Sequence, residues 1–140
     1  MSAPRVALWG AGMISGAHAV AAGALQLPIT AVASRSVERA TEQAERLHTV
    51  AARYEDLPGD ADIVIVATPP QLHAEHALHL LAVGAAVVLE KPLCTTLTDA
   101  DRLVAAAAAH GERLLYAENL AYAPVMTTLI RMAAAMGPPT

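Results

Sequence analysis

The chain contains few of the residues that mark several common classes of protein. Among its 140 residues there is one cysteine, Cys94, and no phenylalanine, and aromatic residues make up 3%. A single cysteine excludes an internal disulfide and a zinc site built from several cysteines. Nucleic-acid binding usually needs a basic face or stacking rings, and the net charge here is −4. We therefore expect no nucleic-acid partner.

The sequence also has no long hydrophobic run. Every apolar stretch is interrupted by Arg, Glu, Asp or His before the ~18 residues that a membrane span needs. Residues 1–5 lead straight into an apolar segment, without the pattern of a signal peptide. We expect no membrane partner and a cytoplasmic protein. A hydrophobic content of 55% argues against disorder, and the length suits one domain with its own core.

Short apolar segments alternate with helical patterns along the chain, which predicts βαβ units around a parallel sheet. Strands are predicted at about 5–9, 28–33, 49–51, 62–68, 86–89 and 113–117. Helices are predicted at about 13–23, 37–47, 72–82 and 98–110 and from 124 to just before 137, with a turn at 57–60. The expected fold is a doubly wound α/β Rossmann fold, three-layer αβα, with strand order 3-2-1-4-5-6.

A glycine turn follows the first predicted strand. The segment from Gly10 to Ser15 has the form G-x-G-x-x-small. In such a turn the first glycine makes the bend, and Gly12 lets the backbone approach a pyrophosphate at the start of the helix. We expect Gly10, Gly12, Met13 and Ile14 to bind a dinucleotide. The alternative is an ordinary connection between a strand and a helix.

The end of the second predicted strand indicates which dinucleotide binds. Folds of this type usually place Asp or Glu there to hold a ribose hydroxyl, but this chain has Ser34 and Arg35, with Arg39 one helical turn further on. A hydroxyl and guanidinium groups suit a 2′-phosphate. We therefore predict NADP, with NAD as the less favoured cofactor. The alternative is that both arginines are solvated surface charges.

Lys91 follows the predicted buried strand at 86–89, between Glu90 and Pro92. The carboxyl ends of parallel strands are where open α/β sheets bind their ligands. A lysine at this place is a candidate for proton transfer. It can equally be a solvated lysine at the end of a strand.

Four groups of residues, taken together, form a recognisable set. They are Gly10-Ala11-Gly12-Met13-Ile14 with His18, Ala67-Thr68-Pro69-Pro70 with His73, Glu90-Lys91-Pro92, and Ala117-Glu118-Asn119 with Tyr122 and Pro124. The set resembles the Gfo/Idh/MocA oxidoreductases over nearly the whole chain. The Glu-Lys-Pro segment is its specific part, because many families share the glycine turn.

The resemblance implies roles for particular residues. Lys91 would transfer a proton to or from the substrate hydroxyl beside the nicotinamide, and Glu90 would contact the nicotinamide ribose. Pro92 would set the backbone that follows Lys91. Thr68 and Pro69 would line the cofactor cleft.

The same resemblance places two further residues. His73 would lie behind Thr68 and Pro69, and Asn119 would touch the nicotinamide region. A loop amide that bonds only to the backbone is an equally good interpretation of Asn119.

The chain departs from the family pattern in two ways. Pro70 stands where the family commonly has Asn, so one side-chain contact is missing. The family also has a second, substrate-binding domain that supplies an Asp and a His, and the sequence ends at Thr140 before it. We therefore expect a Rossmann domain over 1–120 and the start of the connection to an absent substrate domain over 121–140.

A histidine-rich segment, His73 to His79, is the one place that could suggest a metal. Its spacing is not the His-Glu-x-x-His of zinc enzymes, so no metal site is expected. Exposed apolar residues are expected near Leu120, Tyr122 and Val125, where the missing domain, another partner or a second copy of the chain would pack.

Two functions are consistent with these residues. The first is an NADP-dependent oxidoreductase, represented by its cofactor-binding domain. It would transfer hydride between the nicotinamide and a hydroxyl-bearing carbon of a sugar, polyol or related small molecule, with Lys91 in proton transfer. The alternative is a non-catalytic dinucleotide-binding module, or a truncated fragment that lacks the substrate domain.

Overall fold

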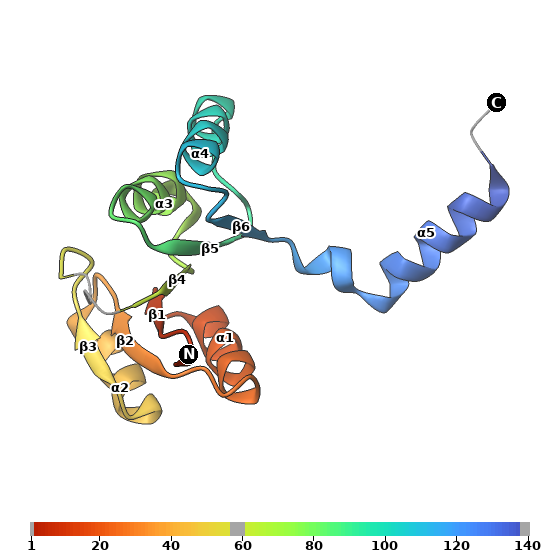
Figure 1. Ribbon diagram of the computed structural model, residues 1–140. Helices are drawn as coiled ribbons and strands as arrows, with labels where there is room; N and C mark the ends of the chain where they lie inside the picture. Colours follow the sequence, from red (N-terminus) through yellow and green to blue (C-terminus); the bar gives the residue numbers. More distant parts are fainter. Residues whose placement is uncertain (1, 57–60, 138–140) are drawn as a thin grey trace.

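One six-stranded parallel sheet forms the centre of the computed structural model, which describes residues 2–56 and 61–137 (Figure 1). Neighbouring strands pair in the order β3-β2-β1-β4-β5-β6, as predicted. The strands are β1 (Val6–Trp9), β2 (Ile29–Ala33), β3 (Val50–Ala52), β4 (Ile63–Val66), β5 (Ala86–Glu90) and β6 (Leu114–Ala117). The turn predicted at 57–60 lies outside the described residues.

The helices lie within one or two residues of their predicted bounds. They are α1 (Met13–Ala24), α2 (Val37–Leu47), α3 (His73–Ala82), α4 (Leu97–Ala109) and α5 (Pro124–Met136), with short 3₁₀ turns η1 (Pro70–Leu72) and η2 (Asn119–Tyr122). Helix α4 begins one residue before its predicted start at 98. Thr96 caps it, because its side-chain oxygen accepts a hydrogen bond from the amide of Asp99 at 3.1 Å.

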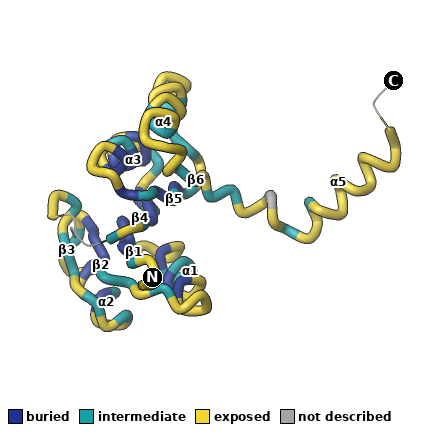
Figure 2. Tube along the Cα trace, viewed as in Figure 1, coloured by how far each residue is buried: buried dark blue, intermediate teal, exposed yellow. Residues whose placement is uncertain are grey.

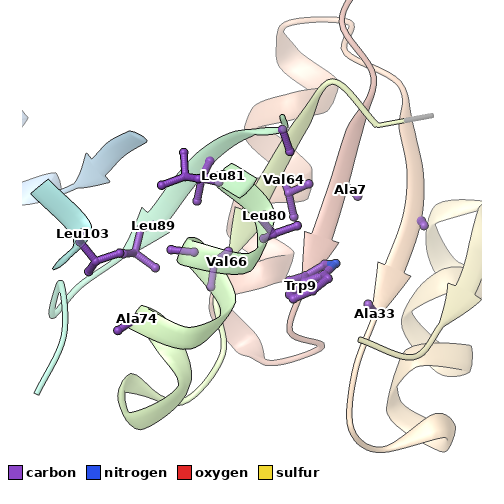
Figure 3. Packing of buried hydrophobic residues seen from close by; sticks show 14 residues of the cluster. Ala7, Trp9, Ala33, Val64, Val66, Ala74, Leu80, Leu81, Leu89 and Leu103 are labelled. Carbon is purple, nitrogen blue, oxygen red and sulfur yellow. The ribbon is translucent and has the colours of Figure 1, made fainter. Parts of the chain in front are cut away.

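Two helical layers cover the sheet. Side chains alternate between the faces of a strand, so Leu8 of β1 points to one layer and Trp9 to the other. Leu8 packs with Ala19 of α1 and Ala44 of α2. Trp9 belongs to the larger cluster, which contains residues of α3 and α4 and is drawn in Figure 3. This arrangement is the three-layer αβα fold that the sequence predicted.

The strand order places the point where the sheet changes direction between β1 and β4. The chain moves outward from β1 through β2 to β3, then returns to β4 on the other side of β1. The loops that follow β1 and β4 therefore separate at the carboxyl edge of the sheet. In open α/β sheets this edge forms the ligand crevice.

Helix α5 stands away from the rest of the chain (Figure 1), and none of its described residues is buried (Figure 2). The apolar residues expected at this surface are exposed, with Leu120 at 58%, Tyr122 at 82% and Val125 at 61%, which confirms that prediction. Among the residues that the structure describes, no helix is both long and apolar enough to cross a membrane.

Candidate functional site: a cleft at the carboxyl edge of the sheet

Gly10 forms the floor of the cleft. Its φ of +122° is one that L side chains rarely adopt, and a Cβ built on it would lie 2.3 Å from the carbonyl oxygen of Ala67. Glycine is therefore required for the ends of β1 and β4 to approach this closely. Ser15, which is fully buried, donates its hydroxyl hydrogen to the Gly10 carbonyl oxygen at 2.6 Å. The small third residue of the motif thus closes the turn as well as permitting close packing.

The start of α1 presents backbone amides without a side-chain cap. Gly12 is the N-cap residue, no side chain caps the helix, and a Cβ on Gly12 would meet no atom within 4 Å. The amides of the first turn are left without intrahelical partners, and the helix dipole favours an anion near them. Met13 is 97% exposed and Ile14 is 41% exposed at the same place. This geometry suits a pyrophosphate.

The segment after β2 combines hydroxyl groups with two free cations. Ser34 is buried and its hydroxyl oxygen accepts from the Ser36 amide at 3.2 Å. Ser36 caps α2 by accepting from the Arg39 amide at 3.3 Å. The exposed guanidinium groups of Arg35 and Arg39 form no ion pair or side-chain hydrogen bond with any described residue. Both are available to an anionic ligand.

These parts enclose a pocket of about 260 Å³. The glycine turn, Ser34 to Ser36, Arg39 and Tyr54 line it, together with Thr68 and Pro69 after β4 and Leu72 of η1. A larger hollow lies between α1 and α2 and shares Ala11, Gly12 and Arg39 with this pocket. The smaller pocket also includes the residues that follow β2 and β4 at the carboxyl edge of the sheet, so we take it as the ligand site.

Tyr54 lines this pocket and was not among the residues predicted from the sequence. Its ring lies 5.4 Å from the ring of Trp9 and 4.7 Å from that of His76. The available signal was its position two residues after β3, at the same sheet edge as the glycine turn. Because Trp9, the only tryptophan of the chain, contacts Tyr54, its fluorescence can report on the pocket.

His73 lies behind the cleft, where its ring nitrogens are 2.7 Å from the Pro92 carbonyl oxygen and 2.8 Å from that of Thr68. The side chain is 1% exposed and does not line the pocket. His73 therefore joins the loop after β4 to the loop after β5. The structure places it as a support for Thr68 and Pro92.

His76, one turn further along α3, lies 3.2 Å from the Thr68 hydroxyl through Nδ1. Burial lowers the pKa of His76 below its usual value; Glu75 opposes this shift, and His73 and His79 add to it. The neutral ring is favoured in the folded chain. Among the described residues no three His, Cys, Asp or Glu side chains come together as a metal site.

At the end of β5 the Glu90 carboxylate has two protein partners. Oε1 accepts from His18 Nε2 at 2.8 Å, and Oε2 accepts from the Lys91 amide at 3.0 Å. The side chain of Lys91 is exposed and has no hydrogen bond or ion pair with any described residue, and the peptide bond to Pro92 is cis. Asn119 is exposed in η2, next to β6, and does not line the pocket.

The geometry agrees with comparisons to known proteins. Residues 4–118 match the family model GFO_IDH_MocA, described as an oxidoreductase family with a NAD-binding Rossmann fold. Over 101 residues the chain is 36% identical to scyllo-inositol 2-dehydrogenase (NADP(+)) IolU of Bacillus subtilis (strain 168), with 69% of this chain and 30% of that protein covered.

Solved structures have the same fold. GenD2 from gentamicin A biosynthesis, in complex with NAD, superposes with a TM-score of 0.86 at 29% identity, over 96% of this chain and 40% of that one. KijD10, a 3-ketoreductase from Actinomadura kijaniata solved with NADP, has a TM-score of 0.83 at 32% identity, over 94% and 42%. The chain thus spans less than half the length of each of these proteins. It belongs to the Gfo/Idh/MocA oxidoreductase family, and it comprises that family's NAD(P)-binding Rossmann domain.

Proposed function

We propose that this chain is the NADP-binding domain of a dehydrogenase that acts on a hydroxyl-bearing carbon of a sugar, polyol or related small molecule. The observation that carries the proposal is a pair of guanidinium groups on the pocket wall, Arg35 after β2 and Arg39 in α2, which have no partner among the described residues. The turn that follows β2, residues 33–36, contains no acid. The name of the Bacillus subtilis relative, an NADP-dependent inositol dehydrogenase, supports the same cofactor and substrate class.

The pocket suits a 2′-phosphate better than a free ribose hydroxyl. A carboxylate would accept hydrogen bonds from a ribose, whereas Arg35 and Arg39 donate and carry positive charge. The amides at the start of α1 would hold the pyrophosphate, beside Met13 and Ile14. Thr68 and Pro69 would line the opposite wall.

Lys91 is proposed as the group that holds or accepts the proton of the substrate hydroxyl. The bound nicotinamide would supply or accept the hydride. The exposed Lys91 amine is at the carboxyl end of β5 and is free of protein partners among the described residues, so it is available to a substrate. Pro92 and His73 would hold the loop on which it stands, since His73 contacts the Pro92 carbonyl.

Residues 121–140 are proposed to begin the connection to a substrate-binding domain. The exposed apolar residues of η2 and α5 suit a surface that another domain, or another copy of the chain, covers. Substrate recognition would then depend on residues outside the Rossmann domain.

Cofactor titration tests the proposal. We expect the 140-residue chain to bind NADPH more tightly than NADH, measured by Trp9 fluorescence and by calorimetry. Loss of one charge-assisted contact in Arg35→Ala should weaken NADPH binding about tenfold to a hundredfold and leave NADH binding nearly unchanged. Arg102→Ala, on α4, removes the same charge away from the pocket and is the matched control.

Two outcomes would count against NADP. Tighter binding of NADH than NADPH would contradict the assignment, and so would an equal loss for both cofactors in Arg35→Ala. The alternative of a non-catalytic module is favoured by the absence of a second proton-transfer group in contact with the Lys91 amine among the described residues. Assaying the same samples for reduction of NADP⁺ with inositols separates a binding module from a working enzyme.

A further inference from the structure

We propose that His18 is a positioning residue for the reacting end of the cleft. Through the Glu90 carboxylate it holds the backbone of Lys91 in place. The proposal rests on the proposed cofactor site, but its first test does not require a cofactor.

The contact is built from two parts of the chain that are 72 residues apart. His18 lies on α1, the helix that begins at the glycine turn, and Glu90 ends β5. The two side chains are 20% and 12% exposed. Strand β5 is not a neighbour of β1, because β4 lies between them. The pair therefore connects the helix at the glycine turn directly to the end of the strand that precedes Lys91.

The carboxylate acts as a bridge between the two. Oε1 takes the His18 hydrogen bond at 2.8 Å, while Oε2 takes the Lys91 amide at 3.0 Å. Hydrogen bonds to an ionised group are the stronger kind. Partial burial reduces competition from water at the His18–Glu90 bond, whereas the bond to the Lys91 amide is exposed. If the His18 bond is removed, the Glu90 side chain gains rotational freedom and its bond to the Lys91 amide loses its fixed geometry.

The resemblance to the family suggested that Glu90 contacts the nicotinamide ribose. In the structure each of its oxygens already has one protein partner, and each can accept a further hydrogen bond. Beside the expected ribose contact, we assign to Glu90 a second role, which is to hold the backbone of Lys91. His18 then determines the shape of the reacting end without touching the substrate.

The experiment compares His18→Leu, His18→Asn and His18→Gln in the 140-residue chain. A glutamine amide nitrogen reaches about as far as His Nε2 and can donate to Glu90, whereas an asparagine amide is one carbon shorter and leucine cannot donate. His110→Leu, at the exposed end of α4, is the matched control. The first readout is hydrogen exchange of the Lys91 amide, followed by NMR.

We expect Lys91 exchange to be about tenfold faster in His18→Leu and His18→Asn, as for the loss of one hydrogen bond, and near the original rate in His18→Gln. Amides of β1 serve as the reference for global stability. The Leu and Asn variants together keep the test valid if one of them fails to fold. Unchanged Lys91 exchange in a folded variant would overturn the proposal.

The second readout compares NADPH with adenosine 2′,5′-bisphosphate, which lacks the nicotinamide end. His18→Leu should weaken NADPH binding by about tenfold and leave the bisphosphate unaffected. Equal weakening of both ligands would indicate general damage and would also overturn the proposal. If the unmodified chain binds neither ligand, the proposed cofactor function fails, while the exchange readout still decides the role of His18.

Discussion

Single residues at the glycine turn show how a motif combines structural and functional requirements. Gly12 leaves open space for a ligand, whereas Gly10 is enclosed by protein, with the Ala67 carbonyl where its Cβ would be. The two glycines of one motif are therefore needed for different reasons. Gly12 permits a ligand to approach, and Gly10 permits two strand ends to approach.

Gly10→Ala should therefore destabilise the fold even without cofactor. The added methyl group meets backbone, and a positive φ adds strain, so we expect a loss of about 2–4 kcal/mol in the free energy of unfolding. Urea denaturation followed by circular dichroism measures it. Gly23→Ala, exposed in α1 with no atom near its Cβ, should instead gain up to about 1 kcal/mol. Similar values for the two variants would refute this assignment.

Among the elements, α3 differs from an ordinary core-packing helix, because two of its buried residues are histidines. The ring of His76 packs edge-on against Trp9 at 5.1 Å, and His73 joins two loops. A helix that packs on the sheet thus also supports the cleft. His73 lies within hydrogen-bond distance of the Thr68 and Pro92 carbonyl oxygens, and His76 of the Thr68 hydroxyl.

The buried position of His76 predicts a pH dependence of stability. Burial lowers the pKa of His76 in the folded chain. Below about pH 6.5, the ordinary pKa of histidine, the unfolded chain therefore takes up the proton more readily. The contribution of His76 is therefore present above this pH and is lost as the pH falls. Urea denaturation across this range should show a weaker dependence for His76→Gln than for the unmodified chain. His110→Gln should keep the original slope; equal slopes for all three proteins would disprove the role of His76.

On the scale of the whole molecule, the described residues form a packed sheet domain and a helix, α5, that no other described element covers. The core clusters involve β1 to β6 and α1 to α4, and they include no residue of α5. Leu129, Ile130 and Met132 of α5 are each at least half exposed. Such a surface favours association with another domain or another molecule.

Removing α5 should therefore leave the sheet domain intact. A chain that ends at Ala123 loses no buried side chain of the described part of α5, so its melting temperature should stay within about 3 °C of the original. It should also associate less, as seen by sedimentation at increasing concentration. A chain that ends at Gly111 is the comparison, because it loses β6 and the packing of Leu114 on the core and should melt much lower. Strong destabilisation of the 123-residue chain would contradict this view of α5.

Local sequence patterns were sufficient to predict the helices and strands and the order of the strands in the sheet. Strands at the centre of a parallel sheet read as short apolar runs, and glycine, proline and caps mark their ends, so each signal lies within a few residues of what it predicts. The start of α4 differed from its prediction by one residue. Thr96 and Thr98 are both residues that often cap a helix, and the extended backbone at Thr96 decides between them. The positions of the glycine turn, Arg35 and Lys91 at one edge followed from the strand order alone.

By itself, then, the sequence determined a Rossmann sheet, its strand order and the edge at which the candidate ligand-binding residues gather. Only the tertiary structure decided that His18 holds Glu90, that His73 supports Thr68 and Pro92, and that Tyr54 walls the pocket. The physical reason is distance along the chain. These contacts depend on how helices pack across a twisted sheet. The local pattern of apolar and polar residues does not show which distant side chains this packing brings into contact.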